Sequence, residues 1–197
     1  MSFEGGGCCR QPDASSPIIF DLEGNGVSLS NHAGGVSFDL NFDGTPQPLS
    51  WTIEGSDDSW LALDRNGSGT IDNGGELFGN YTQQPEPPAG VLRNGFLALA
   101  QFDKIANGGN ADRIIDHRDS IFRSLLLWQD ANHNGISEQA ELKSLFHSGV
   151  KSIDLDFKMS KRVDQYGNRF RYRAQVKDVN DAHIGRWAWD VFLLTTP

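Results

Sequence analysis

Alternating apolar and polar positions mark the two ends of the chain. Near its start, PIIFDLEGNGVSLS and GVSFDLNFDGTPQPLSWTIE each place an apolar run before a turn that begins with Asp, a pattern typical of strands joined by polar turns. Near its end, apolar residues alternate from Ile153 to Met159, and a QYGN turn leads into a second alternating segment. These patterns predict β-hairpin units over residues 18–80 and an antiparallel sheet over residues 150–197.

The middle of the chain has a helical period instead. Apolar residues recur from Phe96 at the spacing of one helix face, and Asn94 is suited to cap the helix start. The same spacing predicts further helices over residues 119–128 and 137–149, the last with Phe146 turned inward. The polar segment between these two helices makes a helix–loop–helix pair the expected arrangement.

That polar segment, WQDANHNGISEQAEL, matches the twelve-residue calcium loop D-x-[DN]-x-[DN]-G-x5-E. A hard cation prefers six to eight oxygen ligands, and alternate oxygen-bearing side chains in a tight loop point them inward. An Asx-rich turn that caps a helix without metal is the alternative. Ser137 stands at the eighth position, where loops of this kind normally carry an apolar residue. The candidate ligands are Asp130, Asn132, Asn134, Glu141 and the backbone carbonyl of Ile136.

Two further segments follow the same scheme with one departure each. In the first, the closing acid comes one residue late, after Gly75; in the second, residues are inserted after the first Asp, and Arg113 stands where Gly is expected. The candidate ligands are Asp64, Asn66, Ser68, Thr70, Asp72 and Glu76 in the first segment, and Asp103, Asp112, Ile114, Asp116 and Asp119 in the second.

Two segments nearer the start keep only the first half of the loop pattern. They have no acid at the twelfth position, where His32 and Ser50 stand. Hairpin turns with polar tips explain them almost as well as metal sites do. Their candidate ligands are Asp21, Glu23 and Asn25, and Asp39, Asn41 and Asp43.

The expected fold class is therefore α+β. It comprises N-terminal β-hairpin units, a central EF-hand-like helix–loop–helix pair over residues 94–149 and a C-terminal antiparallel sheet. A chain of 197 residues with 38% hydrophobic residues can bury a core of its own, so we expect one domain over residues 18–197. Residues 1–17, rich in Gly, Ser and Pro, are expected to form a flexible leader.

Charge narrows the range of partners. The formal net charge is −9, with the acidic surplus in residues 1–150, whereas residues 151–197 are net basic. Such a surplus argues against a nucleic acid as the main partner and favours cations. No apolar run approaches the roughly 18 residues that a membrane span needs.

The basic residues near the end alternate along one expected strand, at Arg169, Arg171, Arg173 and Lys177. They are the solvent-facing side of a sheet in the simpler interpretation. In the alternative, they dock onto an acidic protein or an anionic glycan.

The motifs, in their order along the chain, resemble the calcium-binding modules of large secreted bacterial proteins, including RTX-associated proteins. The segments SPIIFDLEGNGVSL, VSFDLNFDG, LALDRNGSGTIDNGGELFGN, FLALAQFD and LLLWQDANHNGISEQAEL carry the resemblance, which covers residues 17 to about 155. The closing segments DQYGNRFRYRAQV and RWAWDVFLL look like the sheet of one branch of that family. The resemblance implies a module that binds several Ca²⁺ ions in EF-hand-like loops and is secreted or lies at the cell surface, although the sequence shows no export signal.

Some relatives in that group are calcium-dependent self-processing modules. They cut an Asp-Pro bond just ahead of themselves and can join the new Asp end to a Lys. This sequence contains no Asp-Pro, and Asp13 is followed by Ala14. It also lacks the HExxH, CxxC, GxSxG and P-loop patterns of other chemistries. We therefore expect a non-enzymatic calcium-binding module, with self-processing as the alternative.

Overall fold

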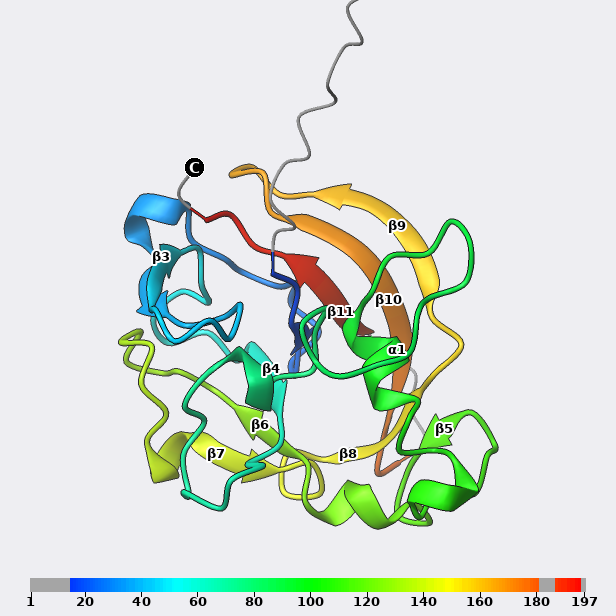
Figure 1. Cartoon of the computed structure of the whole chain (residues 1–197). Helices are drawn as coiled ribbons and strands as arrows, with labels where there is room; N and C mark the ends of the chain where they lie inside the picture. The colour runs from blue at the N-terminus through cyan, green and yellow to red at the C-terminus, as the bar shows by residue number, and fades with distance from the viewer. Residues whose placement is uncertain (1–14, 181–186, 196–197) are drawn as a thin grey trace, which may run out of the picture.

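A curled antiparallel sheet organises the chain (Figure 1), for which the computed structural model describes residues 15–180 and 187–195. Eight strands follow one another across the sheet in the order β5-β8-β10-β11-β1-β4-β6-β7, and β9 pairs with β10. A separate hairpin joins β2 to β3. The strands are β1 (Ile18–Phe20), β2 (Val36–Phe38), β3 (Gln47–Leu49), β4 (Ser59–Ala62), β5 (Ile114–Ile115), β6 (Leu126–Trp128), β7 (Leu142–Ser144), β8 (Val150–Asp154), β9 (Lys158–Val163), β10 (Arg169–Asp178) and β11 (Trp187–Phe192).

The first and last strands lie side by side, which closes the fold. Strand β1 pairs with β11 on one edge and with β4 on the other. All three of its residues are buried, because successive side chains enter different cores on the two faces of the sheet. Ser15 and Ser16 are also buried, and their carbonyls accept backbone hydrogen bonds from Leu193 and Asn80. Residues 1–14 of the expected leader lie outside the described residues.

Tryptophan packing fills the core on the face that carries the β2–β3 hairpin. The Trp51 ring centroid lies 4.6 Å from that of Trp60 and 5.4 Å from that of Trp128, and Phe38 from β2 completes the group. Such aromatic clusters bury a large apolar area with defined geometry. The other face packs against α1 (Gly95–Leu99), whose residues Phe96 and Leu99 are fully buried.

The expected helix–loop–helix pair is wrong. Helix α1 is five residues long, and it is the only α-helix among the described residues. Asn94 does cap it, since the side chain accepts a hydrogen bond from the Leu97 N–H. The other two expected helices are replaced by 3-10 turns at Ser120–Arg123 and Gln139–Glu141, followed by β6 and β7.

The apolar run LLLW forms a buried strand where a helix was expected. A short apolar run fits a strand buried on both faces as well as it fits a helix stripe. Here Leu127 and Trp128 face opposite cores, and β6 pairs with β4 and β7 in the interior of the sheet. Phe146, expected to turn inward, is 70% exposed. The fold is therefore mostly β.

The alternating C-terminal segments do form antiparallel strands, but in the same sheet as β1 and β4. Strands β9 and β10 make a hairpin, and β10 continues onto β8. The basic side chains of this region stack on aromatic rings: the Arg162 guanidinium lies 4.1 Å from the Phe170 centroid, and that of Arg173 lies 4.4 Å from Trp187. These cation–π contacts give the basic side chains a structural role.

Within the part of the chain that the structure describes, no helix has both the length and the apolar character needed to cross a membrane.

We expect Phe96→Ala to lower the free energy of unfolding by about 3–5 kcal/mol, because it empties a fully buried site beside Phe157. The matched control is Phe146→Ala, which should change it by less than about 0.5 kcal/mol because that ring is exposed. Urea unfolding followed by circular dichroism measures both. Equal losses in the two variants would contradict the assigned core.

Candidate functional site

Five polar loops share one backbone conformation. Counted from its first Asp, each loop has left-handed residues at the fourth and sixth positions, a conformation that favours Gly. The loop at Asp103 fits the count if residues 104–108 are treated as an insertion, and Arg113 adopts the left-handed conformation that Gly usually supplies. The fourth-position residues are Gly24, Phe42, Gly67, Ala111 and His133, and the sixth-position residues are Gly26, Gly44, Gly69, Arg113 and Gly135, all with φ between 57° and 103°.

The insertion in the loop at Asp103 begins and ends at nearly the same point of the backbone. A Cβ on Gly109 would lie 2.2 Å from the Asp103 carbonyl carbon, so the chain returns directly onto the residue where the insertion begins. The Ala111 N–H then donates to the Asp103 carbonyl over 2.7 Å. Asp103 and Asp112 therefore sit in one loop despite their separation in sequence.

The first Asp of each loop holds that conformation by accepting hydrogen bonds from the backbone. Its carboxylate takes the N–H of the fifth residue at 3.0–3.2 Å and that of the sixth at 2.9 Å. Charge-assisted bonds of this kind are stronger than neutral ones. Four of the loops begin at a strand end: Asp21 and Asp39 directly follow β1 and β2, and Asp64 and Asp130 come two residues after β4 and β6.

Three of the five loops are closed by a second acid. Glu76 and Glu141 accept the N–H of the second loop residue at 2.9 Å, and Asp119 accepts that of the third, Asn110, at 3.3 Å. Each closing acid also accepts the N–H of the ninth residue. The extra residue before Glu76 therefore does not prevent closure.

The ninth-position acid faces the side chains of the third and fifth positions. Asn66, Thr70 and Ser68 donate to Asp72 and lower its pKa. In the loop at Asp130, Glu138 accepts from Asn132 and Asn134 in the same way. Sequence reasoning missed Glu138, although counting to the ninth position from Asp130 would have found it.

Two carboxylates meet in the loop at Asp130. Hydrogen bonding from Asn134 and contact with Glu141 lower the pKa of Glu138, whereas burial and the contact with Glu138 raise the pKa of Glu141. The Glu138 Oε2 atom is buried and has no hydrogen-bond partner among the described residues. An acid pair with an unsatisfied buried oxygen suits a bound cation.

The loop at Asp130 is anchored to the tryptophan core and to the loop at Asp64. The Trp51 indole N–H donates to Asp130 over 2.8 Å, and that of Trp128 to Glu141 over 3.3 Å. The Ser137 hydroxyl accepts the Ile71 N–H over 2.6 Å. Ser137 and Ile71 are the eighth residues of their loops. The Ser137 hydroxyl therefore makes the contact between two loops at the position where an apolar residue is normally found.

An arginine lies against the acids of the loop at Asp103. The Arg118 guanidinium contacts Asp112 at 2.5 Å and Asp116 at 2.7 Å, and it lowers the pKa of Asp116. Burial raises the pKa of the closing residue Asp119. A cation in this loop would compete with Arg118 for the same carboxylates.

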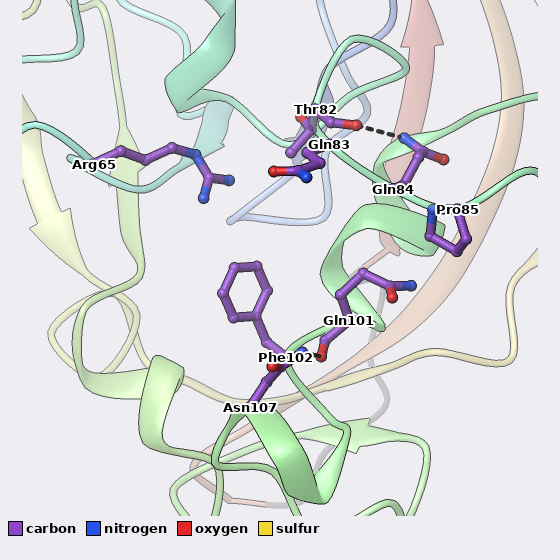
Figure 2. A pocket seen from close by; sticks show the side chains of 8 residues that line it. All are labelled: Arg65, Thr82, Gln83, Gln84, Pro85, Gln101, Phe102 and Asn107. Atoms are coloured by element: carbon purple, nitrogen blue, oxygen red, sulfur yellow. Dashed lines mark hydrogen bonds between the residues drawn. The ribbon is translucent and has the colours of Figure 1, made fainter.

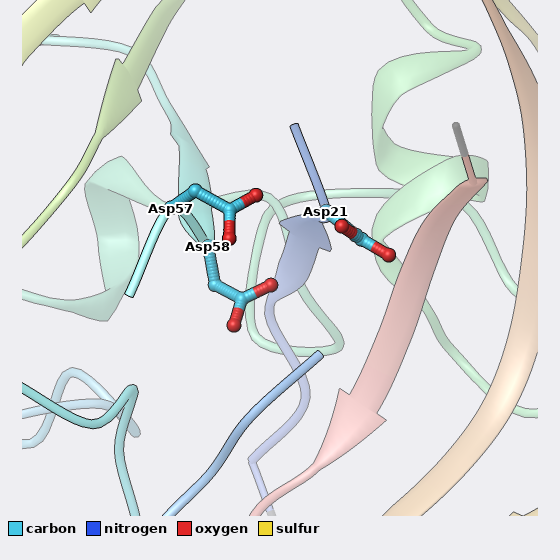
Figure 3. A group of neighbouring side chains, drawn as sticks. All are labelled: Asp21, Asp57 and Asp58. Carbon is cyan, nitrogen blue, oxygen red and sulfur yellow. The ribbon is translucent and has the colours of Figure 1, made fainter. Parts of the chain in front are cut away.

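The loops at Asp21 and Asp39 end differently. Ser50 stands at the twelfth position of the loop at Asp39. The loop at Asp21 instead receives two carboxylates from a distant segment, Asp57 and Asp58. One oxygen of each of these three Asp residues lies within 4.8 Å of the others, in the one such acidic group found among the described residues. Figure 3 shows the carboxyl groups of Asp57 and Asp58 directed toward the side on which Asp21 lies.

Another buried carboxyl, Asp190 of β11, lies apart from the loops. It is fully buried, and its Oδ2 accepts the Gly95 N–H over 2.6 Å and the Ser16 hydroxyl over 3.3 Å. Its other oxygen has no partner within the described residues. Burial raises the pKa of Asp190 to about 8.

A pocket of about 750 Å³ opens beside the loop at Asp64. Figure 2 shows the Arg65 guanidinium directed into it, opposite the Phe102 ring and next to Gln83. Among the described residues that line the pocket there is no carboxylate, histidine or cysteine. Its chemistry is polar and cationic, without the acid–base pair that most hydrolytic sites use.

These observations define a mostly β module that presents acid-closed loops at the ends of its strands. A model of the SPM domain matches residues 18–192, and the chain therefore belongs to the SPM domain family. The iron-regulated protein FrpA of Neisseria meningitidis serogroup C is 38% identical over 144 residues, which is 72% of this chain and 12% of that protein. The chain thus spans a small part of the length of this relative.

Asp190 predicts how stability depends on pH in calcium-free buffer. Its pKa is about 8 in the folded protein and about 3.9 when unfolded. The folded state therefore binds the proton more tightly, and the free energy of unfolding falls as pH rises from about 4 to about 8. We expect Asp190→Asn to make this decline shallower in urea titrations with EDTA.

The matched control is Asp156→Asn, at an exposed carboxyl whose pKa Lys158 lowers. The contribution of Asp156 to stability is lost only as pH falls below about 4. The Asp156→Asn variant should therefore show the same decline in the free energy of unfolding between about pH 4 and about pH 8 as wild type. Identical pH slopes for wild type and Asp190→Asn would rule out the raised pKa.

Proposed function

We propose that this chain is a calcium-binding module of a secreted or cell-surface bacterial protein, folded and rigidified by several Ca²⁺ ions. The loops at Asp64, Asp103 and Asp130 carry the proposal. Each is shaped by a first Asp and closed by a second acid. Turns that merely cap a strand need one such acid, whereas an oxygen cage for a hard cation needs several. The flanking helices of an EF-hand are not part of the proposal.

All the candidate ligand atoms in these loops are oxygens, which suits calcium. The buried, unpartnered Glu138 Oε2 and the raised pKa of Glu141 indicate that the loop at Asp130 has charge to neutralise. The ions would be held by Asp64, Asn66, Ser68, Asp72 and Glu76 with the Thr70 carbonyl, by Asp103, Asn110, Asp112, Asp116 and Asp119 with the Ile114 carbonyl, and by Asp130, Asn132, Asn134, Glu138 and Glu141 with the Ile136 carbonyl.

Calcium would act here through charge neutralisation. Clustered carboxylates repel one another without the ion, so the binding energy becomes folding energy. Asn at the third and fifth positions lowers the charge of the loop at Asp130, which favours affinity in the weak extracellular range of roughly 10⁻⁵ to 10⁻³ M. The relationship to FrpA, a bacterial protein, and the resemblance to secreted modules support a location outside the cell.

Calorimetric calcium titration of the EDTA-stripped chain tests the proposal. We expect three or more ions to bind, and Glu141→Gln to bind one fewer, because the variant loses the carboxylate that closes its loop. The matched control is Glu86→Gln, at a surface carboxylate that pairs with Arg93, and it should keep the full count. No binding at millimolar calcium, or an unchanged count in Glu141→Gln, would refute the proposal.

Calcium-dependent self-processing is the second candidate function, and the surroundings of position 16 would suit it if that position carried an Asp. In the modules that the sequence resembles, the cut bond lies directly ahead of the module, and here that bond joins Ser16 to Pro17. The Ser16 hydroxyl donates to Asp190, a carboxyl that is protonated at neutral pH because its pKa is about 8. An Asp at position 16 would face this acid, whereas Ser16 lacks the carboxylate that an Asp-Pro cut involves.

We therefore expect wild type to leave the Ser16–Pro17 bond intact and Ser16→Asp to cut it when calcium is added. Intact-mass spectrometry would detect a fragment that begins at Pro17. Ser15→Asp is the matched control, because it adds the same charge without creating an Asp-Pro bond. A Ser16→Asp chain that stays whole in calcium, or is cut equally in EDTA, would count against this function.

A further inference from the structure

The acidic group at Asp21, Asp57 and Asp58 is assembled by strand pairing. Strands β1 and β4 are antiparallel, with Phe20 opposite Ser59. Asp21 directly follows Phe20, and Asp58 directly precedes Ser59, so the register brings the two carboxyl groups together at one end of the strand pair. Asp57 lies beside them, and one oxygen of each of the three residues lies within 4.8 Å of the others (Figure 3).

Asp58 is buried with an unsatisfied oxygen. The residue is 1% exposed, and its Oδ2 accepts the Ser28 N–H over 2.8 Å. Its Oδ1 is buried and has no hydrogen-bond partner in the described part of the chain. An unpartnered buried carboxylate oxygen is costly, so this atom indicates a missing ligand of positive charge.

No basic side chain within residues 15–180 and 187–195 supplies that charge. None of the salt bridges found among the described residues involves Asp21, Asp57 or Asp58. Burial, and then repulsion from Asp57 and Asp21, raise the pKa of Asp58 to about 7. The three carboxyl groups thus lie together without a counter-charge among the described residues.

Asp57 closes this loop much as Glu76, Asp119 and Glu141 close the other three. Asp57 Oδ2 accepts the N–H of the third loop residue, Glu23, over 2.7 Å, across 34 residues of sequence. Asp57 Oδ1 accepts from the side chain of the fifth residue, Asn25, over 3.0 Å. Asp57 thus closes the loop from another segment, because the twelfth residue, His32, is not an acid.

We propose that Asp21, Asp57 and Asp58 form a fourth divalent-cation site of the calcium class, held between the end of β1 and the start of β4. The site goes beyond the three acid-closed loops, shares no residue with them and does not depend on their binding metal. Three carboxylates from two segments would let the ion fasten the first strand to the interior of the sheet.

Amide NMR of the full ¹⁵N-labelled chain tests this site during calcium titration from an EDTA-stripped start. The Gly26 and Ser28 N–H groups donate to Asp21 and Asp58, and they report on the proposed site. Gly69 and Gly135 report on two of the acid-closed loops. We expect the Gly26 and Ser28 signals to shift saturably in wild type, and Asp58→Asn to weaken their apparent affinity by about tenfold or more while Gly135 titrates as before.

Asp43→Asn, in the loop whose twelfth residue is Ser50, is the matched control and should leave the Gly26 and Ser28 titrations unchanged. The site is overturned if Gly26 and Ser28 stay still at calcium concentrations that saturate Gly135, or if Asp58→Asn titrates like wild type. Wild type alone decides the first point, so the test does not depend on a variant that folds. If Gly26 and Ser28 shift while Gly69 and Gly135 do not, this site stands and the calcium-loop proposal fails.

Discussion

A carboxylate that accepts the backbone N–H groups of the fifth and sixth loop residues shapes each of the five polar loops. The bond to the sixth residue measures 2.9 Å in all five loops, and it holds the left-handed turns that reverse the chain. These compact turns lie at the ends of three-residue strands such as β1 and β6, and they let the chain reverse after so short a strand. The sheet therefore depends on Asp side chains at its rim as well as on its apolar cores.

The charged loops and the core are coupled through indole groups. Trp51 and Trp128 pack at the centre of one core, yet their N–H groups donate to Asp130 and Glu141. A change in the charge or position of these carboxylates would therefore act directly on the tryptophan core. This coupling gives a physical basis for the proposal that calcium rigidifies the whole module rather than a peripheral turn.

The loops could be predicted from the sequence to a large extent, since their geometry is local. The first, third and fifth positions, the ninth-position Asp72 and the late closing acid Glu76 all lie in the arrangement that the spacing implies. The main departure from the loop pattern is Arg113, which stands where Gly is expected. Asp103 accepts its backbone N–H, and Arg113 adopts the left-handed conformation nonetheless. Whether these residues bind calcium stays a prediction.

The helices and the distant acids could not be predicted in the same way. Periodicity does not separate a short buried strand such as Leu126–Trp128 from a helix stripe, because the answer depends on which strands flank it. Asp57 and Asp58 join Asp21 only through the register of β1 and β4, which is a long-range property. Asp190 was missed for the same reason, since its partners Ser16 and Gly95 come from distant segments.

Anomalous diffraction from crystals of the full chain grown with calcium tests the calcium proposal most directly. We predict a peak inside each of the acid-closed loops at Asp64, Asp103 and Asp130, with Glu138 and Glu141 among the nearest residues to the last. A well-ordered crystal whose map has no peak within any of these loops at millimolar calcium would contradict it.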